Sequence, residues 1–331
     1  MSVRVAQLGL GPIGQACVRV LAEKPGVELV GGLDLDPERV GRDLGELCGA
    51  GRSLGPVRDD AEAALAAWRP DVVLHTTQSF LDRVEAQIAT VVAAGAHVVS
   101  STEELFYPLP RDRDFCARVD ALAARHGVAV VGTGVNPGFA MDVLPLTLSS
   151  VCVRVESIDV RRVVDASRRR LPLRRKIGAG LTAEEFGEKK AAGGFGHIGL
   201  DESARAVAGT LGWPVDRLEG SLDPVIAERR VETEGLTVEP GRVAGQRQVL
   251  TVESGGRQRL RLELQMYVGA PDPEDRVTIE GDPGIVSRIE GGIFGDTATV
   301  ATLVNAVPRI AVARPGLRTM MELGVPYAFG T

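Results

Sequence analysis

Val3-Arg-Val-Ala-Gln-Leu-Gly-Leu-Gly-Pro-Ile-Gly14 decides the fold of this chain. Its first half is apolar and predicts a buried strand, and its glycine-rich half opens a helical pattern that runs to Glu23. A second apolar run, from Val27 to Leu33, ends at Asp34. A strand, a glycine turn, a helix, a second strand and an acid in this order are typical of a dinucleotide-binding unit. The alternative is an ordinary turn between a strand and a helix, but the second strand and the acid favour the dinucleotide.

Each glycine of this turn has a predicted task. Gly9 allows the tight turn, Gly11 lets the backbone approach a pyrophosphate, and Gly14 lets the helix pack closely on the strand. The N-terminal N–H groups of the helix and its positive dipole end suit the phosphates. Asp34 is placed to accept hydrogen bonds from the ribose hydroxyls. The predicted cofactor-binding residues are Gly9, Gly11, Pro12, Ile13, Gly14, Asp34, Arg39, Thr76 and Thr77.

Composition narrows the class of protein. The 331 residues suggest two domains, and 44% hydrophobic residues suffice for a large core. The formal net charge of −6 argues against a nucleic-acid-binding protein. No apolar run approaches the roughly 20 residues of a membrane span, and the N-terminus does not resemble a signal peptide. Because the four cysteines lack a CxxC spacing and the four histidines lack metal-ligand spacing, we expect reduced thiols, a cytoplasmic protein and no metal site.

The pattern of the chain changes once. Up to about residue 140, short apolar runs alternate with helical patterns, which predicts a doubly wound parallel sheet of the Rossmann type. After about residue 150, alternating residues predict an α+β domain with a mainly antiparallel sheet. We expect a dinucleotide-binding domain over 1–145, a substrate-binding and oligomerisation domain over 146–293, and a segment 294–331 that packs back on the first. The predicted strands are Val3–Leu8, Glu28–Leu33, Val72–His75, His97–Ser100, Ala129–Gly132, Val153–Val164, Val231–Val238, Arg242–Glu253, Arg257–Val268 and Val277–Glu280. The predicted helices are Ile13–Glu23, Ala61–Trp68, Leu81–Ala94, Phe115–Arg125, Thr182–Ala192, Asp201–Gly212 and Asp296–Val307, and Arg314–Leu317 is expected to be a loop.

Reactive side chains are expected at the carboxyl ends of the parallel strands, where such sheets bind their ligands. Glu103 and Glu104 follow the fourth predicted strand, and a carboxylate there could take a proton from an amine or a hydroxyl; the alternative is a helix-start pair stabilised by the dipole. Asn136 and Pro137 follow the fifth strand, where Asn136 could hold a substrate or simply shape the turn. His197 lies in a glycine-rich loop, so a site role and a structural role are both open.

Five segments resemble the 2,4-diaminopentanoate dehydrogenases and the related native amine dehydrogenases, within the dihydrodipicolinate-reductase-like group. The likeness covers nearly the whole chain, and the Asn-Pro-Gly segment is its most distinctive part. The segments are GLGPIG (9–14) with DLDP (34–37), STEEL (101–105) with YP (107–108), GTGVNPGFAMDVLP (132–145), DASRRRLPLRRKIGAG (165–180) and GHIGLDES (196–203).

The resemblance implies reversible NAD(P)-dependent oxidative deamination of an amine that needs no α-carboxylate, and in reverse the reductive amination of a ketone or aldehyde with ammonia. It places the catalytic carboxylate in the Glu103-Glu104 pair and the substrate pocket at Asn136, Pro137 and His197. Within the pair, the spacing to Asn136 favours Glu104 over Glu103. One alternative is an NAD(P)H-dependent reductase of another carbonyl or a cyclic imine. Another is a non-catalytic NAD(P)-sensing protein.

The cofactor and the assembly are the last two expectations. Asp34 favours the free 2′-hydroxyl of NAD, whereas Arg39 and Arg42 could pair with the 2′-phosphate of NADP, so we expect both cofactors to bind. A homodimer or larger assembly is expected through the second domain, because the alternating strands need cover on their second apolar positions. The basic stretch 161–176 is expected near that contact, or else to be a solvated loop.

Overall fold

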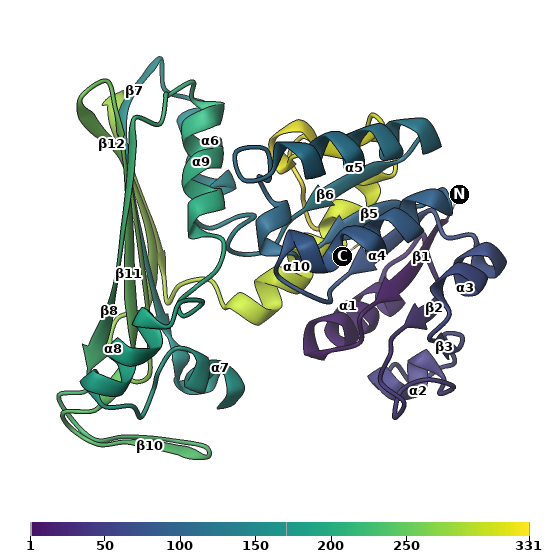
Figure 1. Cartoon of the computed structure of the whole chain (residues 1–331), viewed down its shortest axis with the longest axis horizontal. Helices are drawn as coiled ribbons and strands as arrows, with labels where there is room; N and C mark the ends of the chain where they lie inside the picture. Colours follow the sequence, from purple (N-terminus) through teal and green to yellow (C-terminus); the bar gives the residue numbers. More distant parts are fainter. Residues whose placement is uncertain (1, 170, 331) are drawn as a thin grey trace. The chain divides into compact units, whose positions relative to one another are not determined.

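The computed structural model describes residues 2–169 and 171–330. These residues form two compact units, Met1–Phe139 with Gly295–Thr331 and Ala140–Phe294. The first unit is built on a parallel sheet and the second on a mixed, largely antiparallel sheet (Figure 1). The predicted fold class is therefore confirmed, and each unit is described by itself below.

A seven-stranded parallel sheet forms the centre of the first unit, in the order β15-β6-β5-β4-β1-β2-β3. Its inner strands are short apolar runs that are buried on both faces; all four residues of β4 and of β6 are buried. The expected loop at Arg314–Leu317 is wrong, because Gly316–Arg318 pairs with the strand that begins at Ala129 and becomes the edge of the sheet. The strands are β1 (Val3–Leu8), β2 (Val27–Leu33), β3 (Val57–Arg58), β4 (Val72–His75), β5 (His97–Ser100), β6 (Ala129–Gly132) and β15 (Gly316–Arg318).

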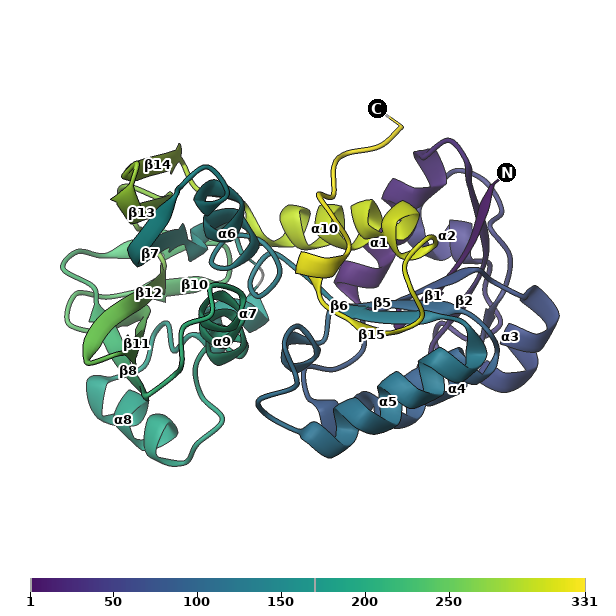
Figure 2. The same cartoon turned by 90° about the horizontal axis from the view of Figure 1, so that it is seen from above.

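Helices cover both faces of this sheet. Figure 2 shows α4 and α5 on one face and α1 and α10 on the other. A large apolar cluster, which includes Leu65, Ile88 and Phe115, fills the space between the sheet and the helices of the first face. The helices and 3-10 turns are α1 (Pro12–Glu23), α2 (Leu44–Cys48), α3 (Ala61–Trp68), α4 (Leu81–Ala93), η1 (Glu103–Leu105), α5 (Arg113–His126), α10 (Gly295–Ile310) and η3 (Met320–Glu322). None of the helices in the described residues is long and apolar enough to cross a membrane.

A six-stranded sheet forms the second unit, in the order β14-β13-β7-β12-β11-β8. Its pairs are antiparallel except for β7 and β12, which run parallel, so the expectation of antiparallel neighbours fails at this one pair. The predicted strand Val231–Val238 is also wrong, because it folds into a small hairpin that turns at Gly235 (φ +74°). The strands are β7 (Arg154–Asp165), β8 (Arg217–Ile226), β9 (Val231–Thr233), β10 (Leu236–Val238), β11 (Val243–Ser254), β12 (Arg257–Tyr267), β13 (Glu274–Asp282) and β14 (Ile285–Glu290).

The helices of the second unit lie on one side of its sheet (Figure 1). They cover the apolar face on which Val160 of β7, Leu262 of β12 and Leu250 of β11 are register neighbours. A buried ion pair, Arg162–Asp275 (2.9 Å, both side chains at most 3% exposed), lies on the same face. The helices are α6 (Val143–Ser149), η2 (Ala166–Arg168), α7 (Leu171–Lys176), α8 (Ala183–Ala191) and α9 (Leu200–Thr210).

The opposite face of this sheet is charged. Glu263 of β12 accepts hydrogen bonds from Arg247 (2.7 Å), Arg261 and Gln265 (2.6 Å). Burial raises the pKa of Glu263, but these three donors lower it to about 2. The expectation that apolar positions line this face is therefore wrong: charged side chains occupy alternate positions and neutralise one another in ion pairs.

Candidate active site

The glycine turn between β1 and α1 has the geometry that its sequence predicts. Gly9 has φ +87°, and a Cβ on it would lie 2.6 Å from the carbonyl oxygen of Thr76. A Cβ on Gly14 would lie 1.9 Å from the carbonyl oxygen of Gly9, so this position must be glycine for α1 to approach the turn. At Gly11, by contrast, no described atom lies within 4 Å of an added Cβ. The glycine at position 11 thus keeps space open in front of the helix and is not needed for internal packing.

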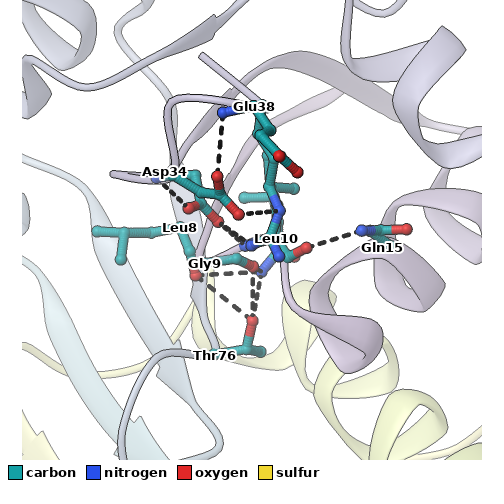
Figure 3. A network of polar contacts seen from close by, with 10 residues as sticks. Leu8, Gly9, Leu10, Gln15, Asp34, Glu38 and Thr76 are labelled. Atoms are coloured by element: carbon teal, nitrogen blue, oxygen red, sulfur yellow. Dashed lines mark hydrogen bonds and ion pairs between the residues drawn. The ribbon is translucent and has the colours of Figure 1, made fainter.

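Three side chains hold the turn in place, and Figure 3 shows two of them, Thr76 and Gln15. Thr76 donates its hydroxyl hydrogen to the carbonyl oxygen of Gly9 (2.9 Å), and Gln15 donates to the carbonyl oxygen of Leu10 (2.9 Å). Gln7, which is fully buried in β1, donates to the carbonyl oxygen of Gly9 (3.1 Å). The sequence analysis did not identify Gln7, although a polar residue in the middle of a buried apolar strand is a recognisable signal.

The N-terminus of α1 is prepared for an anion. Three other helices of this unit have an aspartate as N-cap: α2 has Asp43, α3 has Asp60 and α5 has Asp112. Their carboxylates accept hydrogen bonds from backbone N–H groups in the first turn of each helix. The N-cap of α1 is Gly11, no side chain caps it, and its first turn carries no acid. Uncapped N–H groups and the positive end of the dipole favour a phosphate at this place.

Asp34 lies at the end of β2, beside the turn (Figure 3). Its Oδ2 accepts a hydrogen bond from the N–H of Leu10 (2.6 Å) and lies 3.0 Å from Nη1 of Arg39, and its Oδ1 accepts from the N–H of Asp36 (2.9 Å). Although burial raises the pKa of Asp34, these donors lower it below its ordinary value overall. The carboxylate is therefore ionised and fixed at the position where a ribose hydroxyl donor is expected.

A cavity of about 370 Å³ joins these features. Arg39 lines the cavity, whereas Arg42 is not in its described lining and pairs with Glu46 (3.1 Å). The glycine turn, the acid after β2 and the strand end after β4 thus meet in one place, as predicted, and their chemistry fits the adenosine and pyrophosphate of a dinucleotide. The lining residues are Leu8, Gly9, Leu10, Gly11, Leu33, Asp34, Leu35, Arg39, Asp59, Ala61, Thr76, Thr77, Gln78 and Gln87.

The predicted carboxylate pair follows β5 in the 3-10 turn η1. Oε2 of Glu104 accepts a hydrogen bond from the N–H of Leu81 (2.9 Å), the first residue of α4, and Oε1 lies 3.1 Å from Nη1 of Arg111. The Glu104 side chain is 12% exposed, and Glu103 is partly buried beside it. A helix N-terminus and a guanidinium both stabilise the negative charge of Glu104. A carboxylate has about four lone-pair sites, so these two contacts leave it able to accept a further hydrogen.

Asn136 and Pro137 follow β6, the strand next to β5. The bond between them is cis, and Asn136 is 8% exposed. The turn folds tightly on itself, because a Cβ on Gly138 (φ +132°) would lie 2.1 Å from the backbone nitrogen of Gly134. Neighbouring strands of the first unit therefore present Glu103, Glu104 and Asn136 at the same edge of the sheet.

His197 belongs to the second unit. Gln248 of β11 fixes its backbone, since Oε1 of Gln248 accepts from the N–H of His197 (3.0 Å) and Nε2 of Gln248 donates to its carbonyl oxygen (3.3 Å). The preceding Gly196 has φ +115°, a conformation that a residue with a side chain rarely adopts. The loop is therefore held in one conformation by β11, which the sequence did not predict.

Comparisons with known proteins agree with this geometry. Residues 3–104 match the N-terminal domain of dihydrodipicolinate reductase, and residues 139–331 match the C-terminal domain of 2,4-diaminopentanoate dehydrogenase. The fold and the glycine turn thus define a dinucleotide-binding protein of the dihydrodipicolinate-reductase-like class. Within that class, the chain belongs to the 2,4-diaminopentanoate dehydrogenase family, which confirms the resemblance that its motifs suggest.

Three relatives are similar along nearly their whole length. The 2,4-diaminopentanoate dehydrogenase of Acetoanaerobium sticklandii is 32% identical over 98% of this chain and 94% of its own. The amine dehydrogenase of Streptomyces virginiae is 29% identical over 97% of this chain and 96% of its own. The structure of an amine dehydrogenase from Mycobacterium smegmatis superposes with a TM-score of 0.86 at 26% identity, covering 100% of this chain and 98% of that one.

Proposed function

We propose that this protein is an NAD(P)-dependent amine dehydrogenase that oxidises an amine without requiring an α-carboxylate, and that in reverse aminates a ketone or aldehyde with ammonia. The observation that carries the proposal is the Glu104 carboxylate, fixed by Leu81 and Arg111 at the same sheet edge as a cavity suited to a dinucleotide. The names of the relatives, which include amine dehydrogenases, support the same reaction.

The cofactor would be held by the turn and by the end of β2. Gly11 leaves room for the pyrophosphate, the N-terminus of α1 meets its charge, and Asp34 accepts from the adenosine ribose. When bound, the nicotinamide supplies the acceptor or donor of hydride. Both NAD and NADP are proposed to bind, because Asp34 suits a free 2′-hydroxyl while Arg39, at the same cavity wall, can pair with a 2′-phosphate.

Glu104 is proposed to act on the amine. An ammonium group must lose a proton before hydride can leave its carbon, and the carboxylate accepts that proton. Once the carboxyl group has released this proton to water, hydride leaves the carbon and the carbon becomes an iminium. The restored negative charge of Glu104 next to it lowers the energy of the transition state. The contacts with Leu81 and Arg111 hold the carboxylate in place, which suits the second task in particular. Glu103 is the alternative carrier of both tasks.

Asn136 and Pro137 are proposed to shape the substrate pocket in the first unit, and His197 of the second unit is proposed as a further substrate-binding residue. The amide of Asn136 offers donors and an acceptor to a polar substrate group, while the Pro137 ring is apolar. The Gln248 contacts fix the backbone of His197, so the imidazole extends from a defined point.

The assembly and location are also proposals. We propose a homodimer through the charged face of the second sheet, opposite its helices. Charged residues there, such as Arg247 and Glu263, can form ion pairs with the same face of a symmetric copy. Light scattering at micromolar protein would give the mass of a dimer, and a monomer would contradict it. A reducing cytoplasm fits the thiols, since burial raises the pKa of Cys17 to about 12 and that of Cys116 to about 11.

A screen of NAD(P)H consumption tests the activity. The purified protein is given ketones, aldehydes and 2-amino-4-oxopentanoate, each with and without ammonium. We expect consumption that requires ammonium for at least one carbonyl compound. Consumption that is independent of ammonium would identify a carbonyl reductase instead, and tight NAD(P)H binding without consumption of any compound would identify a sensor.

A further inference from the structure

A fully buried histidine lies at the end of β4, between the cofactor cavity and the strand that precedes Glu103 and Glu104. His75 has no exposed surface, and its Nε2 lies 2.7 Å from Oε1 of Gln87 and 2.9 Å from Oγ1 of Thr77. Thr77 in turn donates to the same oxygen of Gln87 (2.7 Å). Gln87 and Thr77 both line the cavity that suits the dinucleotide, so one nitrogen of the ring supports the cavity wall.

The other ring nitrogen lies on the side of the loop that carries Glu103 and Glu104, called the catalytic loop below. Nδ1 of His75 lies 2.8 Å from Oγ of Ser100, the last residue of β5. Ser100 accepts a hydrogen bond from the N–H of Thr102 (3.1 Å), and Thr102 donates its hydroxyl hydrogen to the carbonyl oxygen of Gln78 (2.8 Å). Thr102 is the N-cap of the turn that carries Glu103 and Glu104. A continuous buried chain of hydrogen bonds thus joins the cavity wall to the start of this turn.

The protonation state of His75 decides which group donates and which accepts in the hydrogen bonds of its ring. Burial lowers the pKa of His75 to about 4, so the ring is neutral near pH 7, with one nitrogen that donates and one that accepts. The carbonyl oxygen of Gln87 can only accept, so Nε2 carries the hydrogen. Nδ1 then accepts the hydroxyl hydrogen of Ser100, which Oγ1 of Thr102 (2.9 Å) can share, while the Ser100 oxygen accepts from the N–H of Thr102. Each end of the ring therefore has a distinct partner that the other end cannot replace.

We propose that His75 is a positioning residue that couples the cofactor cavity to the Glu103-Glu104 turn. This inference rests on the proposed function only for the identity of the reaction. A histidine that merely fills the core would support both sides equally, and its loss would weaken cofactor binding, turnover and stability together. A coupling residue instead makes two contacts that can be removed one at a time, one on the side of the cofactor cavity and one on the side of Glu103 and Glu104.

Two substitutions separate these two contacts. Asn places its terminal atoms near the position of Nδ1, and Gln places them near the position of Nε2. His75→Asn therefore keeps the link to Ser100 and loses the link to Gln87, whereas His75→Gln does the reverse. Ser100→Ala is a matched milder variant, because it breaks only the catalytic-loop side and leaves the ring in place. Melting temperatures establish that each variant is folded.

The measurements are the Kd for NADH by fluorescence and kcat at saturating cofactor. Loss of one buried hydrogen bond with its partner left unpaired changes either constant by about tenfold. We expect His75→Asn to raise the Kd about tenfold and leave kcat within about threefold. His75→Gln and Ser100→Ala should instead lower kcat about tenfold and leave the Kd within about threefold. Equal changes of both constants in all three variants, or no change in either, would overturn the coupling.

A second readout does not depend on the reaction. Hydrogen exchange of the peptide that covers 101–106 is measured by mass spectrometry with and without NADH. We expect NADH to slow exchange of this peptide in the wild type, but not in His75→Asn or in Ser100→Ala, at cofactor concentrations that saturate each protein. Equal protection in Ser100→Ala would refute the coupling. If the wild type shows this protection but does not oxidise any amine, the proposed function fails and the coupling stands.

Discussion

Replacing Glu104 by Gln removes the charge of the side chain but keeps its length and one carbonyl oxygen. That oxygen can still accept the N–H of Leu81, so the start of α4 keeps its cap. The ion pair with Arg111, whose side chain is 39% exposed, is lost. A pair of this exposure contributes about 0.2–1 kcal/mol, and the charge at the helix N-terminus a further 0.3–1 kcal/mol or so. We therefore expect the melting temperature to fall by only a few degrees.

The effect on turnover is expected to be much larger. A positioned base is worth about 10²–10⁴ in rate, which corresponds to roughly 3–5 kcal/mol of transition-state stabilisation. Cofactor affinity should barely change, because the glycine turn and Asp34 are the groups proposed to hold the phosphates and the ribose. The variant should thus be folded, bind NADH normally and turn over slowly, a combination that a purely structural carboxylate would not give.

The assay is the initial rate of NADH formation from an amine, together with the Kd for NADH and the melting temperature. Glu103→Gln is the matched control, since it removes the same charge one residue away and should cost less. Near-normal turnover of Glu104→Gln with a collapse of Glu103→Gln would move the role by one residue. If neither variant is slowed, the reasoning from the carboxylate pair is refuted.

Three further predictions follow from the contacts. Gly11→Ala should melt like the wild type but lose at least tenfold in NADH affinity, whereas Gly14→Ala should lower the melting temperature, because its methyl group would lie 1.9 Å from a carbonyl oxygen; equal melting of the two would contradict this. Arg39→Ala should weaken NADPH more than NADH in fluorescence titration, and equal weakening would exclude a 2′-phosphate contact. Because the pKa of Glu263 is lowered from 4.5 to about 2, its contribution to the free energy of unfolding is fully present above about pH 4.5 and is lost as the pH falls through 2. In Glu263→Gln the free energy of unfolding should therefore fall less steeply below pH 4.5, and the same pH dependence as in the wild type would contradict this.

The first unit could be predicted well because its strands are buried on both faces. Short apolar runs bounded by turns give β1, β4, β5 and β6 with the bounds that the structure has. The segment between β2 and α3 could not be predicted, since β3 and α2 are too short to show a period. The edge strand β15 was mistaken for a loop, because its Pro-Gly start indicates a turn and its three residues pair only with a strand far away in the sequence.

In the second unit, the hydrophobic periodicity predicts single strands but not the sheet that they form. Alternation predicts β7, β11 and β12 within one residue at most ends, but it does not say which strands pair or in which direction. The parallel pair of β7 and β12 arises from the connection between them, which the local pattern does not encode. β8 was missed because glycine, proline and charged residues interrupt its alternation, as is common for an edge strand.

The candidate site likewise has one part that the sequence predicts and one part that it does not. The glycine turn and Asp34 are local motifs, so their geometry could be predicted from spacing alone. The roles of Gln7, His75 and Arg111 depend on contacts with residues far away in the sequence. Within a strand, Gln7 and His75 are only polar residues in apolar runs, which marks them as unusual without naming their partners.

The origin of the product nitrogen tests the central claim most directly. The protein is incubated with 2-amino-4-oxopentanoate, NADH or NADPH and ¹⁵N-labelled ammonium, and the product is identified by mass spectrometry. The account predicts a diamine in which the new amino group carries ¹⁵N, formed in step with the cofactor consumed. A hydroxy acid without the label, or cofactor that is bound but never oxidised under these conditions or with the other carbonyl compounds of the screen, would contradict it.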